Sequence, residues 1–279
     1  MRNKPTNYIM RRSIKLLSII FLLLFSPINK AQEVQRIPFY LPVHSSQLRD
    51  SIVKFNDALL EHGFRFEIIH SDLWQQYQQD VRTGNTGIYF APPHFTAWLI
   101  QQHGFTPLLR IENKLKYVIA SKAHDHHIFE INDLVDKKIC TQNPLNLDYL
   151  LIKHAFQRNI QTADTHLVSS VFEEMNNNQT PCSAFSISNH IFEKKEFKNA
   201  EKYIRLAQSA ELNNYAFSMH PSLTKEFLAP LLQLLNKKET REILTPILKL
   251  TASEATLIDA TESDYPSEYF IELQSYWEK

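Results

Sequence analysis

Two apolar runs in the middle of the chain each end in a polar, proline-marked loop and lead into a helix-like segment. The first run, residues 87–91, is followed by Pro92, and the second, residues 138–141, is followed by Gln142. Strand, loop and helix in this order form the unit of an open α/β sheet, in which ligands bind beyond the carboxyl ends of the strands. Two such units predict two loop clusters that could face each other across a cleft.

Residues 36–104 alternate between strand and helix signals. The strands expected here are residues 36–43, 64–69 and 87–91, and the helices are residues 48–60, 71–82 and 95–102. The first of these helices has apolar residues at helical spacing and is closed by Gly63. This alternation indicates a parallel sheet whose strands are joined by right-handed crossovers.

A second, smaller set of strands and helices follows. Its strands are expected at residues 138–141, 165–168 and 182–186. Extended residues 116–120 could carry the chain out of the first domain, and residues 214–219 could return it. We therefore expect a discontinuous first lobe, made of residues 32–115 and 208–279. The second lobe, residues 116–207, is inserted into it.

Composition excludes some functions. The chain has 279 residues but only 4 glycines, so neither of the glycine-rich phosphate-binding loops can be written from it. Formal net charge is +0, and nothing indicates the basic surface that a nucleic-acid partner would require. The length and apolar content suit one large or two medium globular domains.

Residues 1–31 have the layout of a secretory signal peptide. Basic residues such as Arg11 and Arg12 precede the apolar run 16–25, and Ala31 follows a short polar stretch. The run is shorter than the ~20 apolar residues that a membrane span needs. We expect export to the periplasm with cleavage near Ala31, and an uncleaved membrane anchor is the alternative.

Cys140 and Cys182 are the only cysteines in the chain. In an exported protein an even pair is a candidate disulfide. Each cysteine also lies beside an apolar run, where it could be a buried free thiol. The sequence leaves both states open.

Several segments resemble exported solute-binding proteins of the phosphate, phosphite and phosphonate-type (PhnD-like) group. The resemblance lies in four segments. They are the strand and proline-marked loop (87–95), the segment that leads into the second domain (131–141), the helix and strand within that domain (168–184) and the return strand (214–221). Their order and spacing, over about residues 36–240, are similar to those of the group.

The resemblance implies an α/β fold of the two-lobed type II periplasmic-binding-protein class. Each lobe is then a mostly parallel sheet flanked by helices, and two crossover strands form the hinge. It also implies that the chain captures a small polar or anionic, phosphonate-like solute between the lobes and presents it to the permease of an ABC importer. Where that group has a cluster of small hydroxyl residues, this chain has Gln142, Asn143 and Asn146, so backbone N–H groups at the helix start would hold the anion.

Polar side chains gather after the carboxyl ends of the expected strands. We predict that the ligand-binding residues are His44, Ser45, Ser46, Tyr89, Pro92, His94, Gln142, Asn143, Asn146, Ser169, Ser170 and Ser188. Each of the serines and asparagines could instead cap a helix or close a turn. Likewise, the pair Pro92 and Pro93 could present a rigid loop to the ligand or begin a helix.

A metal site is not expected. His124, His126 and His127 are close in sequence, but they lack a recognised ligand spacing, and a solvated loop explains them. No cofactor is expected either.

We expect a monomeric binding protein without catalytic residues, because the chain lacks the glycine-x-serine-x-glycine elbow of a serine hydrolase. One alternative is a sensory or degenerate binding module that signals to a membrane partner such as a sensor kinase. A secreted hydrolase is a weaker alternative, and it would need a nucleophile and a base within hydrogen-bond reach.

Overall fold

The computed structural model describes residues 34–42, 46–70, 74–123, 127–142, 146–150, 152, 164–168, 170–177, 179–193, 202–223, 225–240, 242, 256–268 and 277. The chain divides into two compact units, Met1–Gln35 and Arg36–Lys279. Nearly all described residues belong to the second unit, whereas the predicted signal peptide lies outside the described residues. Among the described residues, no helix combines the length and the apolar character needed to cross a membrane.

The first sheet has six strands in the order β11-β4-β10-β3-β1-β2. Their bounds are β1 (Gln35–Leu41), β2 (Phe64–His70), β3 (Ile88–Ala91), β4 (Thr106–Ile111), β10 (Ala216–Met219) and β11 (Leu257–Asp259). β1 and β3 are parallel, with Phe39 opposite Ile88. β10 is antiparallel to both of its neighbours, so that Phe217 pairs with Phe90 on one side and with Leu109 on the other. The parallel pairing expected from the sequence is present between β1 and β3, whereas β10 and β11 are antiparallel to their neighbours, so the sheet is mixed.

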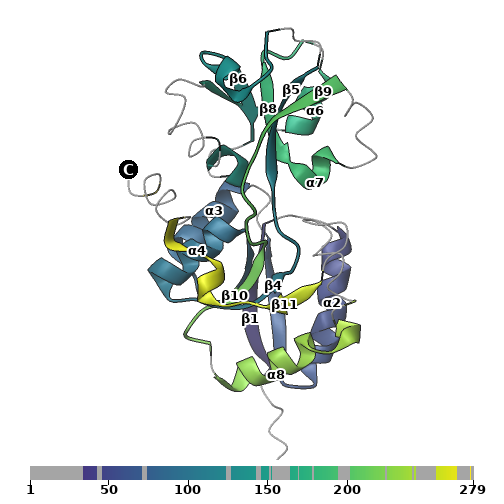
Figure 1. Cartoon of the computed structure of the whole chain (residues 1–279). Coiled ribbons are helices and arrows are strands. Elements are labelled where there is room, and N and C mark those ends of the chain that lie inside the picture. The colour runs from purple at the N-terminus through teal and green to yellow at the C-terminus, as the bar shows by residue number, and fades with distance from the viewer. Residues whose placement is uncertain are drawn as a thin grey trace, which may run out of the picture. The chain divides into compact units, whose positions relative to one another are not determined.

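Helices cover both faces of the first sheet (Figure 1). They are α2 (Ser46–Leu60), α3 (Trp74–Thr83), α4 (Pro93–His103) and α8 (Lys225–Leu235). Because successive strand residues point to opposite faces, Phe39 packs in a cluster with residues of α2 and α8. Its neighbour Tyr40 packs in a separate cluster with residues of α3 and α4, among them Tyr77 and Phe95. Full burial of each such aromatic side chain contributes about 1.5–3 kcal/mol.

The second sheet has five strands in the order β7-β6-β8-β5-β9. Its strands are β5 (Tyr117–Lys122), β6 (Lys138–Thr141), β7 (Asp164–Leu167), β8 (Ala184–Ser188) and β9 (Tyr203–Gln208). The short helices of this part of the chain are α6 (Val171–Asn176), α7 (Asn189–Phe192) and the 3-10 helix η1 (Ile131–Leu134). A further 3-10 helix, η3 (Glu262–Asp264), follows β11 of the first sheet. β6 is parallel to β7 and β8, while β5 is antiparallel to β8 and β9.

A disulfide joins Cys140 of β6 to Cys182, which precedes β8, with 5.6 Å between the Cα atoms. Since β6 and β8 are neighbouring strands, the sheet itself holds the two cysteines within bridging distance. Of the two states that the sequence leaves open, the structure has the bridged one.

Two segments link the sheets, one between β4 and β5 and one between β9 and β10. They pair with each other through Leu115 and Leu212, whose backbone groups exchange hydrogen bonds of 2.8 and 2.9 Å. Both leucines are buried together with Leu147. The two sheets thus take their strands from the segments expected for two lobes, while the division of the chain at residues 115/116 and 207/208 stays a prediction.

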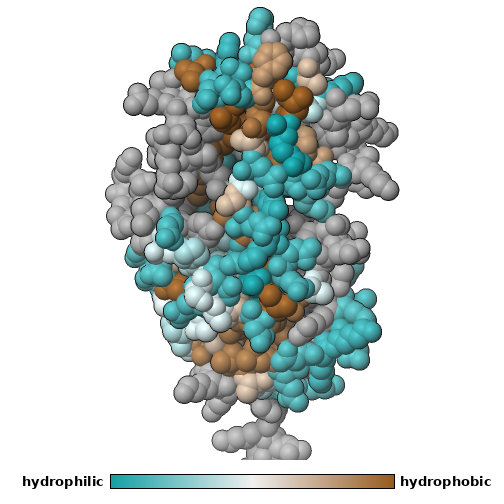
Figure 2. All heavy atoms as spheres, in the orientation of Figure 1, coloured by the Kyte–Doolittle hydropathy of each residue, from teal (hydrophilic) through white to brown (hydrophobic). Residues whose placement is uncertain are grey.

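Hydrophilic and hydrophobic residues occupy separate areas of the surface. On the face seen in Figure 2, hydrophilic side chains cover the middle of the view, and apolar atoms gather near α8 and over the second sheet. The α8 region belongs to a large apolar cluster of the first sheet, which includes Phe227, Leu231 and Leu234.

Candidate functional site

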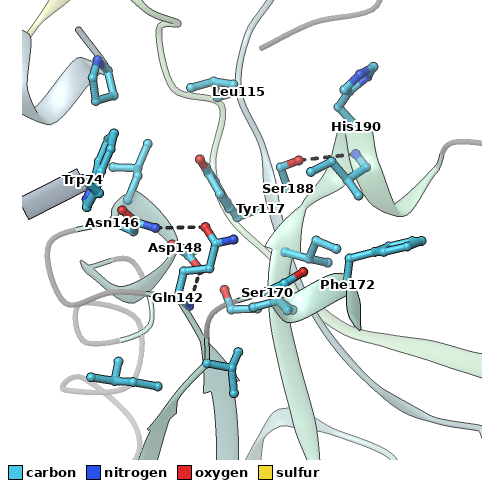
Figure 3. Close-up of a pocket in the computed structure, with 18 of the residues that line it drawn as sticks. Trp74, Leu115, Tyr117, Gln142, Asn146, Asp148, Ser170, Phe172, Ser188 and His190 are labelled. Atoms are coloured by element: carbon cyan, nitrogen blue, oxygen red, sulfur yellow. Dashed lines mark hydrogen bonds between the residues drawn. The ribbon is translucent and has the colours of Figure 1, made fainter. Parts of the chain in front are cut away.

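A cavity of about 850 Å³ lies where residues of both sheets meet (Figure 3). Its lining comprises Trp74, Gln75, Pro92, His94, Leu115, Tyr117, Gln142, Asn146, Leu147, Asp148, Leu167, Val168, Ser170, Val171, Phe172, Ser186, Ile187, Ser188, His190, Ile191 and Tyr215. Most of these residues follow the carboxyl end of a strand, which is where α/β sheets bind ligands.

Helix α4 begins at this cavity. Pro92 is its extended N-cap residue and makes no side-chain cap hydrogen bond, and Pro93 occupies the first turn. The N–H groups of His94 and Phe95 lie in the same turn, where the helix has no carbonyl to offer them. The two prolines therefore begin a helix, and Pro92 and His94 also line the cavity.

A second helix start comes from residues 146–150. The N–H of Leu150 donates to the carbonyl of Asn146 at 3.1 Å, and Asn146 Nδ2 donates to Gln142 Oε1 at 2.9 Å. Asp148 Oδ2 accepts from Thr141 Oγ1 at 2.8 Å and from the N–H of Gln142 at 3.3 Å. The carboxylate thus ties the end of β6 to the helix start.

Burial raises the pKa of Asp148, although these hydrogen bonds work in the opposite direction. Asp148 is the only carboxylate among the described lining residues, and these residues include no lysine or arginine. The lining therefore combines apolar side chains with polar groups, and Asp148 is the one acidic group among these described residues.

Ser170 and Ser188 cap two further helices at the cavity. Ser170 Oγ accepts from the N–H of Glu173 at 3.2 Å at the start of α6. Ser188 Oγ accepts from the N–H of Ile191 at 3.3 Å at the start of α7. In each case the hydroxyl oxygen is the acceptor, so the hydroxyl hydrogen stays available for donation to a ligand.

Two tyrosines next to the linking segments complete the polar lining: Tyr117 begins β5, and Tyr215 directly precedes β10. Burial raises the pKa of Tyr117, and the charge of Asp148 adds to the rise. Burial likewise raises the pKa of Tyr215 to about 12. Both phenols are therefore neutral at physiological pH and can serve as hydrogen-bond donors.

Six predicted site residues line the cavity: Pro92, His94, Gln142, Asn146, Ser170 and Ser188. Their role in ligand binding stays a prediction. His44, Ser45, Asn143 and Ser169 lie outside the described residues, as do His124 and His126. Ser46 is the first residue of α2, and its side chain lies outside the described set.

Tyr89 does not belong to the lining. It is fully buried in the cluster beneath α3 and α4, its ring stacks on Tyr40 at 4.2 Å, and its hydroxyl donates to the carbonyl of Asp80 at 3.1 Å. The physical reason is its place inside β3, whose four residues are all buried, rather than after its carboxyl end.

Several lining residues are not among those predicted from the sequence, including Trp74, Tyr117, Asp148, Ser186 and Tyr215. Trp74 begins the helix that follows β2, so the strand-end rule applied to β2 would have found it. Tyr117 is the first residue of β5 and Tyr215 directly precedes β10, so neither follows the carboxyl end of a strand and that rule does not cover them.

No cluster of three or more histidine, cysteine, aspartate or glutamate side chains that could hold a metal ion occurs within the described ranges.

Solved structures with a similar fold are known. A protein from Xanthomonas citri bound to ATP has a TM-score of 0.70 at 16% identity, and the match covers 86% of this chain and 97% of that chain. PhnD1 from Prochlorococcus marinus in complex with methylphosphonate has a TM-score of 0.64 at 13% identity, with 87% and 99% covered. A binding protein component of an ABC phosphonate transporter from Pseudomonas aeruginosa has a TM-score of 0.60 at 12% identity, with 86% and 84% covered. These likenesses confirm the predicted fold class.

Comparison with curated protein sequences found no match. A family of ABC transporter, phosphonate, periplasmic substrate-binding proteins matches residues 39–265. Since this match spans most of the 279 residues, the chain belongs to the family of periplasmic substrate-binding proteins of ABC phosphonate transporters.

Proposed function

We propose that the chain binds the oxyanion group of a phosphonate-class solute in the cavity and passes the solute, chemically unchanged, to the permease of an ABC importer. The capture of a solute follows from the family, and the chemical class of the solute is the proposal. The observation that carries it is the convergence of helix starts on one cavity at Pro92, Asn146, Ser170 and Ser188.

Helix starts suit an oxyanion for two physical reasons. Aligned peptide dipoles leave partial positive charge there, and backbone N–H groups point towards the ligand. The hydroxyl hydrogens of Ser170 and Ser188 add donors, and hydrogen bonds to an ionised acceptor are about twice as strong as neutral ones. Asp148 repels a bound anion less strongly than a carboxylate without hydrogen bonds would, because Thr141 and Gln142 donate hydrogen bonds that offset part of its negative charge.

Neutral donors also suit a protein that must release its solute. A buried arginine or lysine would hold a phosphonate by full charge attraction, whereas the described lining supplies none. The lining also contains a mixture of donors and acceptors that can orient a polar group without reacting with it. We therefore propose that the chain is not an enzyme.

Export is part of the proposal. Residues 1–31 are expected to direct secretion, and the disulfide between Cys140 and Cys182 supports an oxidising compartment. We propose a periplasmic monomer that meets its permease after the solute is bound. A sensor kinase is the alternative membrane partner.

Isothermal titration and thermal shift with methylphosphonate, phosphate and sulfate test the proposal. A solute at 100 times its Kd should stabilise the fold by about 2.7 kcal/mol, and nuclear magnetic resonance should recover it unchanged. Ethylamine serves as a cationic control that should not bind.

One variant with a control tests the contribution of the Ser170 hydroxyl. Ser170→Asp keeps an acceptor for the N–H of Glu173, so α6 stays capped, but it removes the hydroxyl donor and adds negative charge. We expect at least a tenfold loss of oxyanion affinity. The matched control is Ser263→Ala, because Ser263 is exposed and lies outside the lining. If none of the oxyanions binds, or if Ser170→Asp binds them as tightly as the natural chain, the proposal is wrong.

A further inference from the structure

The cavity has an apolar part next to its polar helix starts. Leu167 at the end of β7, Phe172 in α6 and Ile191 in α7 all line it. These residues are 48%, 41% and 39% exposed, whereas most of the large hydrophobic residues that the structure describes are buried. Exposed apolar surface that gathers in one place marks a binding surface rather than an ordinary solvated one.

Apolar and polar groups alternate closely along the wall. Phe172 follows the cap residue Ser170 by two positions, and Ile191 follows the cap residue Ser188 by three positions. The same short helices therefore present a hydroxyl donor at their start and an apolar side chain within their first turn. Figure 3 shows Phe172 on the opposite side of the pocket from Trp74, which contributes a further aromatic ring to the lining.

The size of the cavity also exceeds what a small oxyanion needs. A volume of about 850 Å³ lies in the upper part of the roughly 300–1,000 Å³ range in which proteins bury organic ligands of drug size. Methylphosphonate consists of a single phosphonate group and one methyl group, and it would fill a small fraction of this space. The polar helix starts would be satisfied, while Leu167, Phe172 and Ile191 would stay in contact with water.

We propose that the natural solute carries a bulky apolar substituent, aromatic or branched, on its phosphonate group, and that Leu167, Phe172 and Ile191 bind this substituent. This inference rests on the proposed function, since the helix starts are assigned to the oxyanion. It adds the class of the substituent and the residues that select for it.

A series of phosphonates with one constant head group tests the inference. Titration calorimetry would compare methyl-, propyl- and phenylphosphonate, with 2-aminoethylphosphonate as a chain of similar length but polar end. Burial of apolar surface predicts about fourfold tighter binding for each methylene group that is buried. Phenylphosphonate should therefore bind at least tenfold more tightly than methylphosphonate, and 2-aminoethylphosphonate should not show this gain.

Variants locate the effect. Phe172→Ala and Ile191→Ala should each reduce the ratio of phenylphosphonate to methylphosphonate affinity by at least threefold. The matched control is Phe129→Ala, because Phe129 is 70% exposed but does not line the cavity, and this variant should keep the ratio.

The outcomes separate the two proposals. If methylphosphonate binds but phenylphosphonate binds no more tightly, the inference is overturned and the proposed function stands. If Phe172→Ala and Ile191→Ala weaken both ligands equally, these side chains serve closure of the cleft, and the inference is again overturned. If no phosphonate binds at all, the proposed function itself fails and the inference falls with it.

Discussion

Breaking the disulfide between Cys140 and Cys182 should lower the free energy of unfolding by about 4 kcal/mol. The bridge closes a loop with a sequence separation of 42, for which the chain-entropy relation gives about 13 cal/mol/K, or ~4 kcal/mol at 25 °C. The loop begins at Cys140 within β6, contains β7 and ends just before β8. It therefore includes the polar lining residues Gln142 and Ser170.

Replacing the cysteines, rather than reducing the disulfide, also removes packing interactions and so lowers the stability further. Both are buried, at 0% and 6% exposure, in a cluster with Met175 and Phe185. A double Cys140→Ala, Cys182→Ala variant loses the bridge and both sulfur atoms. It should therefore be at least as unstable as the reduced natural chain.

Urea unfolding followed by circular dichroism measures the effect, with and without reductant. Reduction should move the midpoint of the natural chain to lower urea, and the double alanine variant should not respond to reductant at all. The variant is thus the control for direct effects of the reductant. An unchanged midpoint for the reduced natural chain, or two titratable thiols in the denatured but unreduced protein, would refute the reasoning.

Three further predictions concern single positions. Asn56→Ala removes the hydrogen bonds between the Asn56 amide and the backbone of Phe66, of 3.0 and 2.7 Å, and leaves two buried groups unsatisfied, so urea unfolding should show a loss of about 2–4 kcal/mol. Burial raises the pKa of Asp148 above 3.8 in the folded chain. The stability that a raised carboxyl pKa contributes is present below the pKa of the unfolded state and is lost as pH rises through the pKa of the folded state. Asp148→Asn should therefore gain in stability relative to the natural chain as pH rises from about 4, as urea unfolding at several pH values would show. Gly87→Ala would place a Cβ 2.6 Å from the carbonyl of Pro38 at φ 155°, so calorimetry should find a lower Tm, whereas a Tm equal to that of the natural chain would contradict the close contact.

The local elements of the first sheet were predictable because each has its own signal in the chain. The expected strands 64–69 and 87–91 correspond to β2 (Phe64–His70) and β3 (Ile88–Ala91). Glycine and proline mark the boundaries: Gly104 takes the left-handed conformation, with φ 68°, that ends α4. Glycine and proline set the backbone conformation of their immediate neighbours, so the boundary of a helix or strand can be predicted from a few adjacent residues.

Long-range pairing has no comparable signal. β10 lies between β3 and β4 although more than a hundred residues separate it from either strand in the chain. The contacts that select this place, such as the pairing of Phe217 with both Phe90 and Leu109, exist only once the sheet has formed. The sequence pattern therefore indicated a returning strand but not its two neighbours.

The site shows the same division between local and distant causes. Pro92, Gln142, Ser170 and Ser188 were found because each follows a strand in sequence, and the sheet geometry brings strand ends together. Tyr89 was included among the predicted ligand-binding residues although it lies within its strand, and all four residues of that strand are buried. Its stacking on Tyr40 in the core is the result.

The linking segments explain why Tyr117 and Tyr215 belong to the site without following a strand end. Both pack against the buried group formed by Leu115, Leu147 and Leu212, and Leu115 and Leu212 form an isolated β-bridge between the segments. Leu147 comes from the helix start that also carries Asp148 and the cavity's amides. If a solute binds at this helix start, as we propose, it would lie next to Leu115 and Leu147, and its binding energy could act on the relative motion of the two sheets. Recognition and closure would then depend on one contiguous set of side chains, which strand-end positions in the sequence reveal only in part.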